Sequence, residues 1–264
     1  MGLFGKKKEV EHCAICGKEK KGGLLRGLFQ ESVGGQYVCN DCYGDVDISP
    51  AILNTMSIDA FKNYLIFREE NAKLKEHFQA TRIMDLGMLN KKIIFDRKNG
   101  YVSFDKSLEK TIFERKHITS FEIREDDQMI FQGNADGLHT YESTVAAKID
   151  AMGPEFERFN HEHRLFDEQF RHMNETQQAE ECDNEPRFKT EEPFRQFVVN
   201  ICFDHLYWDQ MTFEMGAPKF NEIKPDGDAY LAEYRRGYKI MEELSNEIMA
   251  FAFVDRINEL ANEE

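Results

Sequence analysis

Two cysteine pairs near the N-terminus constrain the fold of this chain more than any other feature. Cys13 and Cys16 form one C-x2-C pair, Cys39 and Cys42 form a second, and residues 17–38 separate them. Each pair can present two thiolates from a tight turn, and two such turns complete the all-sulfur tetrahedron of a structural zinc site. We therefore predict one structural Zn²⁺ held by these four cysteines, with no ligand position left open for water.

The residues around the pairs fit this interpretation. Gly17 follows the first pair, where the turn often needs a positive φ. Gly34 and Gly35 supply a second turn, so we expect a hairpin between the pairs, in a zinc ribbon or a treble clef. His12 could replace one cysteine as a ligand. The alternatives are two disulfides, which a chain without a secretory signal disfavours, or a redox pair, which would need a βαβ context.

Composition excludes several classes of protein. The 264 residues include 34 Lys and Arg and 49 Asp and Glu, so the net charge is −15. No apolar stretch approaches the ~20 residues that span a bilayer, and the first residues lack the apolar core of a signal peptide. We therefore expect a cytoplasmic protein that is neither secreted, nor membrane-spanning, nor strongly basic.

The pattern predicts three regions: a zinc module with a basic tail over 1–48, a connector over 49–79 and a β-rich domain over 80–264. A connector helix is expected from Ser57 to about His77, because apolar residues recur over this stretch at helical spacing.

Three hairpins are expected in the β-rich domain, over 92–104, 118–132 and 197–215. Asn99-Gly100 marks the first of them. Residues 138–193 are an expected insertion that contains a helix over 155–180. The fold class is therefore α+β, and a pleckstrin-homology-like barrel closed by a helix fits this order.

A long C-terminal helix is predicted over 228–262. Its apolar residues alternate in steps of four and three, which also occurs in coiled coils. One interpretation packs this helix on the sheet, with Gly237 permitting close approach. The other is a homodimeric coiled coil, so the oligomeric state stays open.

The motifs MGLFGKKK, CAICGKEKKGGLL and YVCNDC resemble an uncharacterised family of bacterial zinc-ribbon proteins. REENAKLKEHFQATR followed by KIIFDRKNGYVSF is similar to that family's connector and first hairpin. The resemblance implies zinc bound by Cys13, Cys16, Cys39 and Cys42, a pleckstrin-homology-like domain of unknown function, and a cytoplasmic bacterial or phage-encoded protein. It implies no activity.

No catalytic motif is recognised, so we expect no enzyme. The stretch 161–163 and His172 could bind a second metal, but helical positions two apart point to nearly opposite faces, which favours a solvated helix.

The turn over 204–209 carries Asp204, His205 and Asp209, and an aromatic plug of Tyr207 and Trp208 is the favoured interpretation. Residues 125–127 are expected to form a turn. Cys182 stands alone, and Cys202 is expected in the core.

These features favour a non-catalytic zinc-binding adaptor whose partner is a protein, bound through the zinc module or the β-rich domain. The alternatives are nucleic-acid binding and peripheral membrane contact, in which Leu3 and Phe4 would assist. Membrane contact would use the three lysines at 6–8, and nucleic-acid binding would use Lys6, Lys7, Lys8, Lys18, Lys20 and Lys21. The strongly acidic remainder of the chain would repel phosphates beyond that patch.

Overall fold

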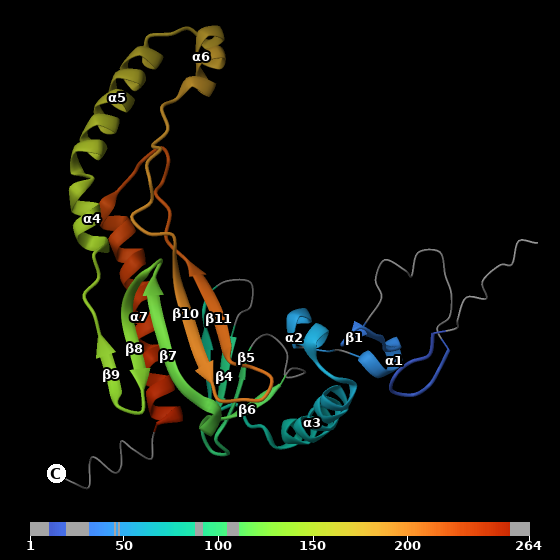
Figure 1. The fold of residues 1–264 in the computed structure, drawn as a ribbon. Coiled ribbons are helices and arrows are strands. Elements are labelled where there is room, and N and C mark those ends of the chain that lie inside the picture. The colour runs from blue at the N-terminus through green and yellow to red at the C-terminus, as the bar shows by residue number, and fades with distance from the viewer. Residues whose placement is uncertain are drawn as a thin grey trace, which may run out of the picture. The chain divides into compact units, whose positions relative to one another are not determined.

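A computed structural model describes residues 11–19, 32–44, 46, 48–87, 92–104 and 111–253 (Figure 1). The chain divides into two units, which are described separately. The first contains Met1–Arg82, Ile94–Phe113 and His205–Asp209, and the second contains Ile83–Ile93, Glu114–Asp204 and Gln210–Glu264. Each unit is therefore assembled from segments that are distant in the sequence.

The first unit begins with a short hairpin and three helices. Strands β1 (Ser32–Val33) and β2 (Gln36–Tyr37) are followed by α1 (Asn40–Tyr43), α2 (Pro50–Thr55) and α3 (Ile58–His77). The Ser57 hydroxyl accepts a hydrogen bond from the Ala60 N–H, so Ser57 caps α3 as predicted. Helix α2 was not predicted, although Ser49 caps it and Pro50 occupies its first turn.

A single hydrophobic core holds these elements together. Its buried residues include Val33, Leu53, Phe61 and Tyr64, and Tyr207 joins them from the segment 205–209. The Tyr207 ring meets the Tyr64 ring edge to face, with centroids 5.1 Å apart. The predicted aromatic plug is thus confirmed.

The structure contains a four-stranded sheet of order β3-β4-β5-β6, formed by Arg82–Asp85, Lys92–Asp96, Tyr101–Phe104 and Ile112–Glu114. The predicted hairpin over 92–104 is confirmed, and Gly100 has the positive φ of 71° that its turn requires. Buried Asn71 of α3 pairs with β6 like a neighbouring strand. Its Nδ2 donates to the Ile112 carbonyl at 2.7 Å, and its Oδ1 accepts from the Ile112 N–H at 2.9 Å.

The second unit contains an antiparallel five-stranded sheet of order β11-β10-β7-β8-β9. The strands are β7 (Ile118–Glu125), β8 (Gln128–Asn134), β9 (Gly137–Thr140), β10 (Gln196–Phe203) and β11 (Gln210–Gly216). The second and third predicted hairpins are therefore present. A closed barrel was expected, but both larger sheets are open among the described residues. Strands β11 and β9 are the edges of the five-stranded sheet, and β3 and β6 are the edges of the four-stranded sheet.

Helices α4 (Val145–Ala151), α5 (Gly153–Arg171) and α6 (Glu175–Glu181) separate β9 from β10, and α5 carries the chain away from the sheet (Figure 1). Two short 3-10 segments, Arg115–His117 and Cys182–Asn184, precede β7 and follow α6. The single helix predicted over 155–180 is wrong. Asn174 starts a new helix there through a capping box with Gln177.

Helix α7 (Gly227–Ala252) packs on β7, β8 and β9. The preferred interpretation of its apolar stripe is confirmed, because Tyr234, Met241, Leu244 and Ile248 are buried within the chain. The helix ends at Ala252 rather than at 262, and residues 254–264 lie outside the described part. Among the described residues, no helix is both long and apolar enough to cross a bilayer.

Two glycines bring backbone close to buried side chains in the second unit. A Cβ on Gly237 of α7 would lie 2.9 Å from the Phe197 ring, so the predicted close approach is confirmed. A Cβ on Gly133 of β8 would lie 2.2 Å from the Phe121 ring and 2.8 Å from the Met249 sulfur. The Gly133 site is the tighter, since atoms crowd it from both the sheet and α7.

We predict that Gly133→Ala destabilises the protein by about 1–3 kcal/mol, because the added methyl overpacks a filled core. The measurement is the free energy of unfolding from denaturant titration. Gly153→Ala is the matched control, since a Cβ at Gly153 meets no atom within 4 Å. Equal stability of the two variants would contradict the prediction.

A buried polar triangle joins α7 to the sheet. The Tyr234 hydroxyl donates to one carboxyl oxygen of Glu125, and the Ser143 hydroxyl donates to the other at 2.8 Å. The Tyr234 and Ser143 hydroxyl oxygens lie 2.7 Å apart. Burial raises the pKa of Glu125, and these hydrogen bonds offset only part of that effect.

This raised pKa makes stability depend on pH. The neutral carboxyl favours folding, so its contribution is complete below the ordinary pKa of about 4.3 and is lost as pH rises through the higher folded value. We predict that Glu125→Gln flattens the fall of unfolding free energy over this range. Denaturant titrations at several pH values test this. Asp127→Asn, at an exposed neighbour, should leave the pH dependence unchanged.

Candidate metal centre

The structure brings all four predicted metal ligands together. The sulfur atoms of Cys13, Cys16, Cys39 and Cys42 all lie within 4.8 Å of one another. A tetrahedral zinc ion with bonds of about 2.3 Å would hold its sulfurs about 3.8 Å apart. The Sγ atoms of Cys16 and Cys39 are separated by 3.6 Å, so the cluster has the dimensions that one such ion requires.

The first pair lies on a tight knuckle. The Gly17 N–H donates to the Cys13 carbonyl and the Cys13 N–H donates to the Lys18 carbonyl, both at 2.9 Å. Gly17 has the expected positive φ, at 73°. A bridge between His12 and Glu19 closes the base of the knuckle. These bonds turn the chain sharply enough for both cysteines to face one point.

The second pair lies at the start of a helix rather than on a second knuckle. Cys39 is the N-cap residue of α1, and Cys42 lies within that helix. The predicted hairpin β1–β2 connects the two pairs, and the Ala14 N–H donates to the Tyr37 carbonyl at 2.9 Å. The order knuckle, hairpin and helix therefore positions the two pairs face to face.

Backbone donors stabilise negative charge on the first thiol. Burial raises the pKa of Cys13, but the N–H groups of Cys16, Cys39 and Ile15 donate toward its sulfur and lower the pKa to about 6. The Cys39 N–H lies 3.3 Å from that sulfur. Burial raises the pKa values of Cys39 and Cys42, and neighbouring thiols add to the rise for Cys42. Four thiolates this close would require a cation, which a divalent metal could supply.

An ion pair bridges the two halves of the site. The Lys18 ammonium, from the knuckle, lies 2.6 Å from the Asp41 carboxylate, which lies between Cys39 and Cys42 in the sequence. The sequence did not identify Asp41 as the partner of Lys18. Lys20 and Lys21 lie outside the described residues. His12 lies outside the sulfur cluster, and its Nδ1 lies 3.2 Å from the Gly17 carbonyl oxygen.

The disulfide alternative finds no support, since all six cysteines are described and all are free. Cys182 is exposed. Cys202 is only half-buried, because it alternates along β10 with the buried Ile201 and Phe203. The prediction of a core thiol at Cys202 is therefore wrong.

The histidines of α5 form no second metal cluster within the described part of the chain, where only the four cysteines gather closely enough. His161 is exposed and contacts Arg164. His163 is half-buried instead of solvated. Its Nδ1 lies 3.5 Å from Asp167 and its Nε2 lies 3.3 Å from Glu185. His172 ends α5 as its C-cap residue.

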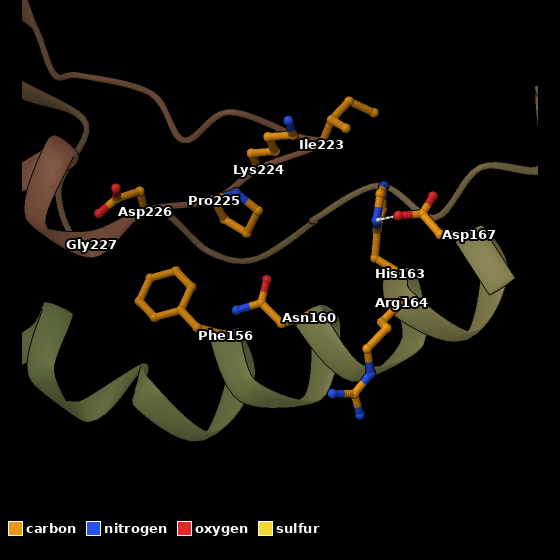
Figure 2. Close-up of a pocket in the computed structure, with 10 residues that line it drawn as sticks. All are labelled: Phe156, Asn160, His163, Arg164, Asp167, Ile223, Lys224, Pro225, Asp226 and Gly227. Atoms are coloured by element: carbon orange, nitrogen blue, oxygen red, sulfur yellow. Dashed lines mark ion pairs between the residues drawn. The ribbon is translucent and has the colours of Figure 1, made fainter.

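His163 borders a pocket of about 450 Å³ between α5 and the segment that leads into α7 (Figure 2). Phe156 and Asn160 extend from α5 toward Pro225 and Asp226 on the opposite side. The Asp226 carboxylate already caps α7 by accepting from the Asp228 and Ala229 N–H groups. Two of the polar residues that line the pocket, His163 and Asp226, therefore already contact other groups of the chain.

The segment 205–209 serves packing. Its His205 ring lies 5.2 Å from the Phe67 ring and 5.0 Å from the Trp208 ring, and its Nδ1 accepts from the Tyr207 N–H at 3.2 Å. Asp209 is exposed. The predicted turn over 125–127 contains only Asp126 and Asp127, because Glu125 is the last residue of β7.

Comparison with known proteins gives no match to a protein-family model, a curated protein or a solved structure. The resemblance to bacterial zinc-ribbon proteins stays a prediction, and the metal centre rests on its geometry.

Removing the metal should change the fluorescence of Trp208, the only tryptophan in the chain. Trp208 packs against the core that contains Cys13 and Cys39, and structural zinc contributes about 10–16 kcal/mol of apparent binding energy that is also folding energy. We predict that a chelator shifts the emission to longer wavelength, as does Cys39→Ser. Cys182→Ser is the control and should retain the wild-type spectrum. Zinc loss without a spectral change would contradict the prediction.

Proposed function

We propose that this chain is a non-catalytic zinc-binding adaptor, whose N-terminal module is a treble clef built around one structural Zn²⁺. The observation that carries the proposal is the convergence of four cysteine sulfurs within 4.8 Å. Four thiolates fill a tetrahedral shell, so the ion would have no open position for water or substrate. Its contribution would be to hold the knuckle, the hairpin and α1 together.

The second unit supports an interaction role by its architecture. It combines an open antiparallel sheet, a buried C-terminal helix and a helical arm, α5–α6, that is exposed along most of its length. We infer that the partner is a protein, bound through the zinc module or through this unit. The pleckstrin-homology-like assignment belongs to the same proposal and is supported by the antiparallel strands followed by a long helix.

Nucleic-acid or membrane binding through the basic N-terminus is not favoured. Of the six lysines that would carry it, Lys18 is the one within the described residues, and its charge is paired with Asp41 at 2.6 Å. A gel-shift titration and flotation with anionic liposomes would reveal either activity through salt-dependent binding.

The test has two arms. Metal analysis of the purified chain should find about one zinc per chain, and Cys39→Ser should reduce it sharply while Cys182→Ser does not. Affinity capture from native lysate then compares the same three proteins. A specific partner that is lost only with Cys39→Ser would place recognition on the intact zinc module.

A partner retained by all three proteins would place recognition on the second unit. A chain without bound zinc would refute the metal centre. A zinc-loaded chain that captures no specific protein would refute the adaptor role.

A further inference from the structure

The four cysteines of the cluster differ in their access to solvent. Cys13 and Cys39 are buried, at 3% and 8% exposure, and Cys42 is half-buried, whereas Cys16 is exposed. Oxidation of cysteine depends on thiolate character and on exposure. Zinc binding keeps all four sulfurs as thiolates, so exposure decides which one a dissolved oxidant reaches. Cys16 is that residue.

A second sulfur lies within reach of Cys16. The Cys39 Sγ is 3.6 Å away, and it belongs to the other half of the site, on the cap of α1. The Lys18 ammonium attracts negative charge on both sulfurs, although the Asp41 carboxylate, 2.6 Å from it, offsets part of this effect. An exposed thiolate with a neighbouring resolving thiolate is the arrangement of a cysteine redox sensor.

We propose that Cys16 is a modification site for hydroperoxides, and that its oxidation expels the zinc ion by forming a Cys16–Cys39 disulfide. This inference rests on the proposed zinc site and adds a regulatory property to it.

The oxidation proceeds in two steps, through a sulfenic acid at Cys16 and then a disulfide. The Cys16 thiolate attacks the hydroperoxide oxygen, the O–O bond breaks, and the leaving alkoxide or hydroxide takes a proton from water. The Cys39 thiolate then attacks the sulfur of the resulting sulfenic acid, the S–S bond forms, and hydroxide leaves and is protonated to water. Two electrons pass from the two sulfurs to the peroxide.

Zinc would retain two thiolates, Cys13 and Cys42, one from each half of the site. A structural site requires four ligands, so the ion should dissociate. Cys39 also belongs to the core that Tyr207 and Trp208 complete, and oxidation should therefore loosen the packing of that core. Reduction and added zinc should reverse the change.

The experiment treats the full zinc-loaded chain with hydrogen peroxide and measures four quantities: zinc before treatment, zinc released, Trp208 emission and disulfide position. We expect about one zinc released per peroxide consumed, a shift of the emission, and linkage of Cys16 to Cys39 by fragmentation mass spectrometry. A thiol reductant with added zinc should restore the original emission.

Cys182→Ser is the matched control, because Cys182 is also exposed but lies outside the cluster. Zinc release should be the same in this variant. Retention of zinc while Cys182 is oxidised would overturn the proposal, as would a disulfide formed within either C-x2-C pair. Absence of zinc before treatment would instead refute the proposed function itself, so the two failures are distinguishable.

Discussion

The repulsion among four sulfur ligands is the constraint on which the first unit depends. Thiolates within 4.8 Å of one another are stable only when a cation lies between them and when the backbone holds them in place. The knuckle at Gly17 and the cap of α1 meet the second requirement, and a divalent metal would meet the first. Because Cys13 and Cys39 are also core residues, the same contacts that position the ligands fill the hydrophobic interior.

The second unit relies on a different balance. Helix α7 buries an apolar stripe against the sheet, with no room for a Cβ at Gly133 of β8 or at Gly237 of α7. One buried triangle of Glu125, Ser143 and Tyr234 fixes the approach of the helix. Hydrogen bonds of this kind add little net energy but are expensive to leave unsatisfied. They therefore specify one packing arrangement of the helix more than they increase its stability.

The features that the sequence predicted well are local ones. The C-x2-C spacing fixes the ligands, Asn99-Gly100 fixes a hairpin, and Ser57 fixes a helix start, because each acts through bonds between near neighbours. The main failure is non-local. The pairing of β10 with β7 spans the whole helical insertion, and no periodicity reveals it, so the open sheets were missed.

Two other errors have specific causes. The sequence showed that residues of β10 alternate between two faces of the sheet, but it did not reveal which face α7 covers. Cys202 was therefore assigned to the buried face, although it lies on the other. The interruption after His172 depends on the reciprocal bonds of Asn174 and Gln177, a capping box without the usual Ser or Thr. The buried partners of Asn71 and Glu125 are distant in sequence and could not be anticipated.

The position of Tyr207 has a consequence for how the molecule is synthesised. The metal ligands all lie within the first 42 residues, yet the core around them contains a ring that the ribosome adds more than 160 residues later. A nascent chain can therefore collect its four cysteines long before it can close the core around them. Until the segment 205–209 emerges, the Tyr64 ring lacks its edge-to-face neighbour Tyr207, and this part of the core stays open to aggregation or to a chaperone.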